Sequence, residues 1–184
     1  FSPVQRMRDL VEDLLTLTRL ESSPRPSIYE MDNVNVAKII ETISREIKEL
    51  DSFDHVIEMS IDDGAIAVGI PEEIYSAINN LIINAVRYTP GGEKITIRWL
   101  TVEDGYVFEV SDSGPGIAPE HLQHLTERFY RVDSPRNTKN GGTGLGLAIV
   151  KHILLRHEST LTITSTIGEG STFGFKLPQA RRST

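Results

Sequence analysis

Hydrophobic side chains near the start of the chain recur every three to four residues, a spacing that places them on one face of a helix. The apolar positions of this first segment are Val4, Met7, Leu10, Val11, Leu14, Leu17 and Leu20. Two prolines in the segment 23–27 then end the helix and form a short, stiff linker. So wide an apolar stripe must be covered. Either the helix packs onto the domain that follows, or it belongs to a helical bundle whose partner helix is missing.

Beyond the linker, short runs of strand-like residues are interspersed with longer segments of helical periodicity. We expect a short strand and turn over 28–36 and a helix, capped by Asn35, that extends to Leu50. Strands are further expected at 56–61, 65–70, 94–100, 106–110, 161–166 and 172–177, and helices at 71–88, 119–125 and 145–156. Because strands and helices do not alternate strictly, the pattern predicts an α/β (α+β) fold, a two-layer sandwich with a mixed, largely antiparallel sheet.

The composition adds a few limits. With 184 residues, 39% of them hydrophobic and 24% charged, the chain has room for one globular domain and an appendage. A net charge of −7 argues against a general nucleic-acid surface. The chain has no cysteine, which excludes disulfides, thiolate metal sites and thiol nucleophiles. No apolar run approaches the roughly 20 residues of a membrane span, and Phe1 falls in mid-helix, so we expect a fragment of a longer protein.

Two asparagines one turn apart are the first candidates for chemistry. Asn80 and Asn84 leave the same face of the 71–88 helix. Asparagine is a poor helix former, and the apolar residues around both positions argue against a solvated face. Neutral amide oxygens suit a Mg²⁺ ion that is shared with phosphate oxygens. Asn79 points about 100° away on the helix and is expected to be structural.

Charged and aromatic residues near the ends of predicted elements extend this candidate site. At the end of the 71–88 helix, Arg87 can reach a phosphate and Tyr88 can cover a base or a ribose. Asp112 follows a strand and precedes Gly114 and Gly116. Its carboxylate can accept a hydrogen bond from an exocyclic amine, which would favour adenine over guanine. The alternative is an ordinary turn, because Asp followed by Gly is common at strand ends.

A second glycine cluster opens the 145–156 helix. Exposed amides of Gly142, Gly144 and Gly146 at the positive end of that helix would form a site for phosphate oxygens. The polar loop before it is expected to be a mobile lid.

Two arginines and two aromatic residues belong to the same region. Arg131 and Arg136 are candidates for contact with a terminal phosphate, or are solvated loop charges. Phe129 and Tyr130 are expected to anchor the lid to the core.

Four segments in a fixed order carry a resemblance to a known family. NNLIINAVRYTP (79–90), DSGPGI (112–117), ERFYRVD (127–133) and GGTGLGLAIV (141–150) resemble the N, G1, F and G2 boxes of the sensor histidine kinases, and GEGSTF (168–173) resembles their last glycine motif. The resemblance implies a Bergerat or GHKL-type ATP-binding fold, shared with gyrase, the Hsp90 chaperones and the MutL repair ATPases. The stretches 125–133 and 156–170 look closest to the phosphate-regulon members of the family.

Residue roles follow from this resemblance by position. It implies that Asn84 is the principal Mg²⁺ ligand with Asn80 in support, and that Arg131 and Arg136 join them in catalysis. Asp112 would bind the adenine amine. The implied ATP-binding residues are Asn80, Asn84, Arg87, Tyr88, Asp112, Gly114, Gly116, Ile117, Tyr130, Gly142, Thr143, Gly144, Leu145, Gly146 and Thr172.

The resemblance also divides the chain. Residues 1–22 resemble the second helix of the family's dimerisation and phosphoacceptor hairpin, 23–27 the linker, 28–178 the catalytic domain and 179–184 a tail. The implied partners are a response regulator and the phosphoacceptor helix of the full-length dimer, with no direct contact to nucleic acid. We expect a cytoplasmic domain of an inner-membrane-anchored bacterial protein, which meets the membrane only through segments that precede this chain.

Two departures from the family pattern qualify the expected activity. Ala77 stands three residues before the first asparagine, where the family often has an acidic residue, and this argues for transfer to a protein acceptor over hydrolysis. No histidine has the phosphoacceptor context. His157 is interpreted as a helix-end residue with a partial charge that the dipole favours, and His121, His124 and His152 as surface or packing residues.

The expected activity is transfer of the γ-phosphoryl of ATP to a histidine outside this chain, for relay to an aspartate of a response regulator in phosphate-limitation signalling. Two alternatives stay open. One is a serine kinase on the same fold that acts as an anti-sigma factor. The other is a degenerate domain that only binds partners.

Overall fold

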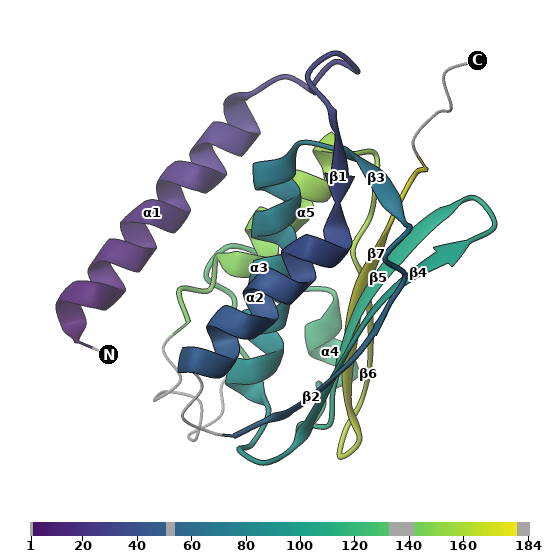
Figure 1. The fold of residues 1–184 in the computed structure, drawn as a ribbon. Helices are drawn as coiled ribbons and strands as arrows, with labels where there is room; N and C mark the ends of the chain where they lie inside the picture. The colour runs from purple at the N-terminus through teal and green to yellow at the C-terminus, as the bar shows by residue number, and fades with distance from the viewer. Residues whose placement is uncertain (1, 51–53, 133–141, 180–184) are drawn as a thin grey trace.

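The computed structural model describes residues 2–50, 54–132 and 142–179. Helices cover one face of a five-stranded sheet, and the first helix lies outside this layer (Figure 1). In chain order the elements are α1 (Pro3–Ser22), β1 (Asp32–Asn35), α2 (Val36–Leu50), β2 (Val56–Ile61), β3 (Ile66–Gly69), α3 (Pro71–Tyr88), β4 (Lys94–Val102), β5 (Gly105–Asp112), α4 (Pro119–Leu122), α5 (Gly146–Arg156), β6 (Thr162–Thr166) and β7 (Gly170–Leu177). The two-layer sandwich predicted from the sequence is confirmed.

The large sheet has the strand order β2-β4-β5-β7-β6. Its β2–β4 pair is parallel and the other pairs are antiparallel, so the predicted mixed, largely antiparallel sheet is confirmed. The strands β2 and β3 are consecutive in the chain but belong to different sheets, because β3 pairs with β1 in a small antiparallel ribbon. The strand β5 extends to Asp112, two residues beyond the predicted Val110. That extension places Asp112 in the ladder opposite Ser171.

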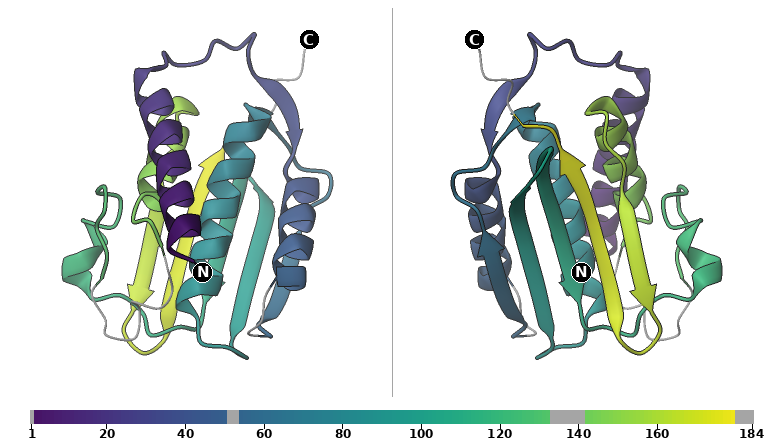
Figure 2. Two further views of the ribbon diagram at one scale, coloured as in Figure 1. Left: turned by 90° about the vertical axis from the view of Figure 1, so that its left-hand side faces the viewer. Right: turned by 90° about the vertical axis from the view of Figure 1, so that its right-hand side faces the viewer.

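Alternation along the strands separates the two faces of the sheet. Phe108 and Val110 of β5 and Phe173 and Phe175 of β7 are buried against the helices. From the helical layer, α3 contributes Ile78, Leu81 and Ile82 to the same core, all of them fully buried. Each such side chain contributes about 2 kcal/mol of hydrophobic stabilisation, which holds α3 against the sheet. Figure 2 shows α3 lying on one face of the sheet.

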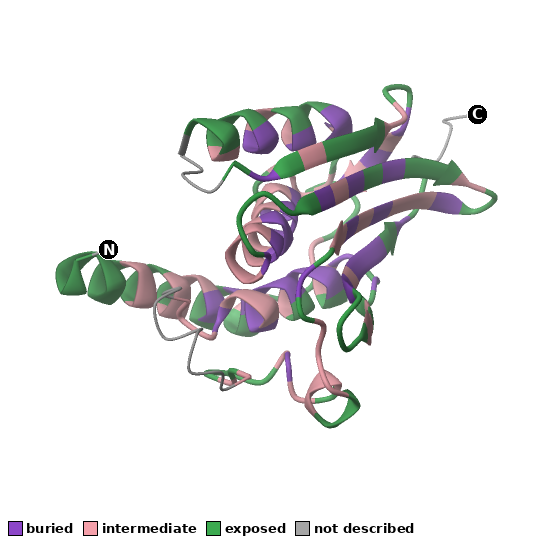
Figure 3. Cartoon of the chain, turned by 90° about the horizontal axis from the view of Figure 1, so that it is seen from below, coloured by how far each residue is buried: buried purple, intermediate pink, exposed green. Residues whose placement is uncertain are grey.

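The first helix divides into two parts. Leu17 and Leu20 in its C-terminal part are buried, and α1 lies against α5. The N-terminal part, residues 3–16, includes no buried residue and leaves an apolar stripe exposed, namely Val4, Met7, Val11 and Leu15. Figure 3 shows the start of α1 extending beyond the rest of the molecule. The first alternative, packing onto the following domain, therefore accounts for only one side of the helix. The predicted domain boundaries stay a prediction. Within the described ranges, no helix is both long and apolar enough to cross a bilayer.

A buried ion pair joins the start of α3 to the end of α5. The Glu73 carboxylate accepts hydrogen bonds from Nε of Arg156 at 3.0 and 3.1 Å. The same guanidinium donates to the carbonyl oxygens of Ser23 and Pro24 in the linker after α1. Three segments thus meet at one arginine, and both charged side chains are nearly inaccessible to solvent. Burial makes each charge dependent on the other.

His157 lies beside this pair and differs from its predicted role. The ring is buried, its Nε2 accepts the backbone N–H of Ile70 at 3.0 Å, and its Nδ1 lies 2.8 Å from the carbonyl oxygen of Ile153. A nitrogen that accepts an N–H carries no proton, so the ring is neutral and Nδ1 donates. The predicted position of His157 at a helix end is confirmed, because it is the C-cap of α5. The expected partial charge is wrong, because the ring is a buried, hydrogen-bonded bridge between α5 and α3.

Glu73→Gln should lower the free energy of unfolding by about 3 kcal/mol, since the buried guanidinium of Arg156 loses its counter-charge. Urea denaturation followed by circular dichroism measures this. Glu72→Gln is the matched control, because Glu72 is the exposed neighbour on the same helical turn. Equal losses in the two variants would contradict this account of the pair.

Candidate functional site

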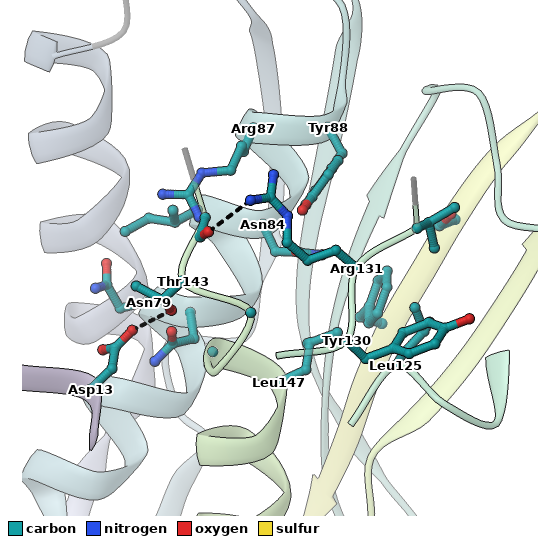
Figure 4. Close-up of a pocket in the computed structure, with 18 of the residues that line it drawn as sticks. Asp13, Asn79, Asn84, Arg87, Tyr88, Leu125, Tyr130, Arg131, Thr143 and Leu147 are labelled. Carbon is teal, nitrogen blue, oxygen red and sulfur yellow. Dashed lines mark hydrogen bonds between the residues drawn. The ribbon is translucent and has the colours of Figure 1, made fainter. Parts of the chain in front are cut away.

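A cavity of about 630 Å³ opens between α3, the end of β5, the loop before α5 and one side of α1 (Figure 4). It collects most of the residues that the sequence patterns singled out: Asn80, Asn84, Arg87, Tyr88, Asp112, Gly116, Ile117, Tyr130, Arg131, Gly142, Thr143, Gly144 and Gly146. Segments that are far apart in the chain therefore form one site. Arg136 lies outside the described residues.

The face that α3 turns to the cavity is wider than the sequence suggested. Asn79 lines the cavity together with Ser76 and Ile83. The prediction that Asn79 is structural is wrong, because a helix side lining a broad cavity spans more than the single row on which Asn80 and Asn84 stand. In Figure 4 the Asn79 side chain lies near Asp13 and Thr143.

Asn80 is held in one orientation. Its Nδ2 donates to the carbonyl oxygen of Ser76 at 2.8 Å and approaches the Ser76 hydroxyl at 3.4 Å. The amide oxygen therefore points the other way, toward the start of α5, where a Cβ on Gly146 would come within 2.8 Å of it. Only glycine leaves room for that oxygen. An oriented neutral oxygen beside a glycine loop fits Mg²⁺ coordination shared with phosphate.

Asp112 forms the opposite end of the cavity. Its Oδ1 accepts the backbone N–H of Gly114 at 2.9 Å. Burial raises the pKa of this carboxyl, and the backbone N–H groups of Gly114 and Ser171 partly oppose the rise. Gly170 packs so tightly beneath it that a Cβ there would lie 1.9 Å from the Asp112 carbonyl oxygen. The last glycine motif thus supports the carboxylate, whereas Gly114 lies outside the lining and orients it.

Thr172 is not part of the site. It pairs with Ser111, and the two hydroxyl oxygens lie 2.8 Å apart on the face of the sheet away from the helices. Ser171 pairs with Asp112 and lines the cavity instead. Because side chains alternate along a strand, a shift of one residue moves a side chain to the other face. The prediction of Thr172 is therefore corrected to Ser171.

Hydroxyl groups beside Ser171 hold the Asp112 end together. The Ser165 and Ser171 hydroxyl oxygens are 2.8 Å apart, and Ser165 Oγ donates to the carbonyl oxygen of Gly170 at 3.0 Å. The same oxygen accepts the backbone N–H of Ile117 at 2.8 Å. The strand β6 is thereby bound to the loop that follows Asp112. No local sequence pattern identified Ser165.

The loop before α5 is fixed by hydrogen bonds at both ends. Thr143 Oγ1 accepts the backbone N–H of Leu145 at 3.2 Å and donates to Oδ2 of Asp13 at 2.6 Å. Nη1 of Arg131 donates to the carbonyl oxygen of Gly142 at 3.2 Å. Leu145 itself is fully buried and lies outside the lining, so its side chain holds the loop against the core.

The two aromatic residues before Arg131, Phe129 and Tyr130, differ in burial. Tyr130 lines the cavity, and its hydroxyl lies 2.5 Å from Nδ1 of His121. Phe129 is 55% exposed, so the prediction that its ring anchors this segment to the core is wrong. It is the Phe129 backbone N–H that holds the segment, because it donates to the carbonyl oxygen of Gly144 at 2.9 Å.

Carboxylates from α1 are the main group that sequence reasoning missed. Asp9, Glu12 and Asp13 line the cavity. Their spacing places them on one edge of α1. No sequence pattern indicates which edge of α1 faces the site, because that depends on how Leu17 and Leu20 pack.

Ala77 acquires a different meaning in the structure. Its side chain is fully buried in the core, so no residue at this position reaches the cavity. The residues of α3 that do line it are Ser76, Asn79, Asn80, Ile83, Asn84, Arg87 and Tyr88. None of these residues is acidic. The lack of a carboxylate base on α3 is therefore a property of all its cavity-lining residues and does not depend on Ala77.

Asp112→Asn should raise the melting temperature at pH 7 by about 2 °C. Because the folded pKa of Asp112 lies above its ordinary value of 3.8, its contribution to stability is greatest below that value and falls as the pH rises through the folded pKa. Asparagine removes that cost at neutral pH and gains nothing once the carboxyl is protonated. Calorimetric scans at pH 7 and pH 4 measure the difference, and a gain that grows toward pH 4 would contradict it.

Comparison with known proteins agrees with this geometry. Residues 69–181 match the family described as histidine kinase-, DNA gyrase B-, and HSP90-like ATPase. The chain is 45% identical over 171 residues to the phosphate regulon sensor protein PhoR of Pseudomonas aeruginosa, covering 91% of this chain and 38% of that protein. It is 40% identical over 175 residues to PhoR of Haemophilus influenzae, covering 95% of this chain and 40% of that protein. The chain thus spans well under half the length of these relatives.

Solved structures of similar fold are also histidine kinases. The Acinetobacter baumannii histidine kinase AdeS is 26% identical with a TM-score of 0.77, covering 97% of this chain and 81% of that one. The mycobacterial sensor histidine kinase MprB is 25% identical with a TM-score of 0.70, covering 80% of this chain and 97% of that one. Given the matched family model, the fold and the glycine-lined cavity, the chain belongs to the histidine kinase-, DNA gyrase B- and HSP90-like ATPases.

Proposed function

We propose that this chain is the ATP-binding catalytic part of a two-component sensor histidine kinase. In the whole protein, it transfers the γ-phosphoryl of ATP to a histidine for relay to an aspartate of a response regulator in phosphate-limitation signalling. The relatives named for the phosphate regulon support that pathway. The observation that carries the proposal is a single cavity with a half-buried carboxylate at one end and two amides, one of them held in a fixed orientation, with a glycine loop at the other.

The carboxylate end suits a base with an exocyclic amine. Asp112 is an acceptor whose position is fixed by Gly114 and by the backbone beneath it. An adenine amine can donate to this carboxylate, whereas the carbonyl of guanine or hypoxanthine at the same position cannot. Ile117 and Tyr88 line the walls between which a planar ring would be held.

The amide end suits a triphosphate. Gly142 and Gly144 precede α5 and Gly146 is its first residue, at the helix N-terminus where backbone N–H groups attract anions. Arg87 and Arg131 line the same end and would neutralise phosphate charge. The amide oxygens of Asn80 and Asn84 would hold Mg²⁺, which supplies further charge neutralisation when bound. These residues hold and orient the nucleotide for in-line attack by an acceptor.

The acceptor is supplied from elsewhere. None of the chain's five histidines, all of which lie in the described residues, lines the cavity. His55 and His157 are buried and bonded to backbone carbonyl oxygens, and His152 lies 3.4 Å from Glu21. A histidine on the phosphoacceptor helix of the full-length dimer fits this requirement, and a cognate response regulator would be the next partner in the relay. We place the chain at the cytoplasmic side of a membrane-anchored protein by analogy with its relatives.

Calorimetry with ATP and inosine triphosphate, which lacks the exocyclic amine, tests the proposal. The parent should bind ATP more tightly than inosine triphosphate by about tenfold to a hundredfold, the scale of a hydrogen bond to a charged acceptor. Asp112→Ala should lose this preference, whereas the control Asp63→Ala, at an exposed turn, should keep it. Equal binding of both nucleotides by the parent would contradict the adenine assignment.

The same titrations with and without Mg²⁺ test the amide end. Asn84→Ala should reduce the gain in affinity that Mg²⁺ provides, and Asn33→Ala, an exposed asparagine in β1, should leave it unchanged. No binding of ATP by the parent would favour the alternative of a partner-binding domain.

A further inference from the structure

The edge of α1 that faces the cavity carries a carboxylate where the proposed nucleotide would place its negatively charged phosphates. Asp13 accepts a hydrogen bond from Thr143 at 2.6 Å, and Thr143 in turn accepts the N–H of Leu145 at the start of α5. A chain of donors that begins at the N-terminus of a helix is suited to a phosphate oxygen. In this structure it ends on a carboxylate, as Figure 4 shows.

The charged groups around Asp13 act on its carboxylate in opposite directions. Burial of the carboxyl raises its pKa, Asp9 and Glu12 on the same helix raise it further, and Thr143 and Arg87 lower it. Arg87 therefore attracts the Asp13 carboxylate, and it is also one of the two arginines proposed to contact phosphate. A triphosphate entering the cavity would compete for the same arginine and the same hydroxyl.

The packing holds two parts of α1 to different extents. Leu17 and Leu20 fix the C-terminal end of the helix against the domain. In the N-terminal part, residues 3–16, no residue is fully buried: Val4, Met7 and Val11 are exposed, and Leu10 and Leu14 are partly buried against the core. This part carries Asp9 and Asp13 and therefore has less buried surface to hold it in place.

We propose that Asp13 is an intramolecular competitor of the nucleotide: it occupies the phosphate-binding hydroxyl of the loop before α5, lowers affinity for ATP, and is displaced with the N-terminal part of α1 (residues 3–16) when ATP binds. The inference rests on the proposed ATP site and deepens it. It makes the position of α1 and the occupancy of the cavity mutually dependent, because each excludes the other from the same contacts. Any force that withdraws α1 would raise ATP affinity without altering the cavity itself.

Asp13→Asn is the direct test, because the amide retains the shape of the side chain and removes its charge. ATP should bind this variant about fivefold to tenfold more tightly than the parent in calorimetry, the scale of one charge acting across a partly hydrated cavity. Asp32→Asn, an exposed aspartate in β1, makes the same change in net charge and should bind as the parent does. An affinity for ATP that is equal to or weaker than that of the parent would overturn the inference. A loss confined to titrations with Mg²⁺ would instead assign Asp13 to the metal.

The chain has no cysteine, so a pair of introduced cysteines can report on α1. Spin labels at Met7→Cys and Asp63→Cys, both exposed, should show a longer or broader distance distribution when ATP is added. An unchanged distribution in a protein that binds ATP would overturn displacement of α1. Failure of the parent to bind ATP would instead reject the proposed function, so the two ideas fail separately.

Discussion

The packing of α3 against the five-stranded sheet is the interaction on which the rest of the structure depends. One side of this helix buries Ile78, Leu81 and Ile82 in the core, and the other side presents Asn80 and Asn84 to the cavity. The burial of the apolar side contributes several kcal/mol and fixes the rotation of the helix. That rotation, in turn, decides which amides face the site. The helix is therefore both the centre of the core and the wall of the cavity.

The site contains groups that lower the stability of the fold when no ligand is bound. Asp112 is half-buried with a raised pKa, and Asp13 is held among other carboxylates. Gly146 and Gly170 contribute no side chain to the packing, and this leaves room for the Asn80 amide oxygen and for the Asp112 backbone, respectively. Such local costs gather at functional sites, where a ligand compensates for them.

Much of the fold was predictable because it follows local patterns. The bounds of α3 match the prediction, and Asn35 caps α2 as expected, with its side chain accepting the N–H of Lys38 at 3.1 Å. Most site residues were found because glycines, amides and a strand-end carboxylate recur in an order typical of one family. The failures share a different cause. Thr172 was predicted, and Ser171 missed, because strand register is not visible in one strand alone. Asp13 was missed because α1 reaches the cavity through tertiary packing. The placement of the Asn79 side chain in the cavity was likewise missed, because it depends on how broad the cavity is.

The central claim is that the Asp112 end and the glycine loop bind one nucleotide together. Hydrogen exchange of backbone amides, measured with and without a non-hydrolysable ATP analogue and Mg²⁺, addresses both ends in one experiment. The account predicts slower exchange at 112–117 and at 142–146 together, because the nucleotide spans the cavity that both segments line. Protection of only one of these segments, or of neither, would contradict it.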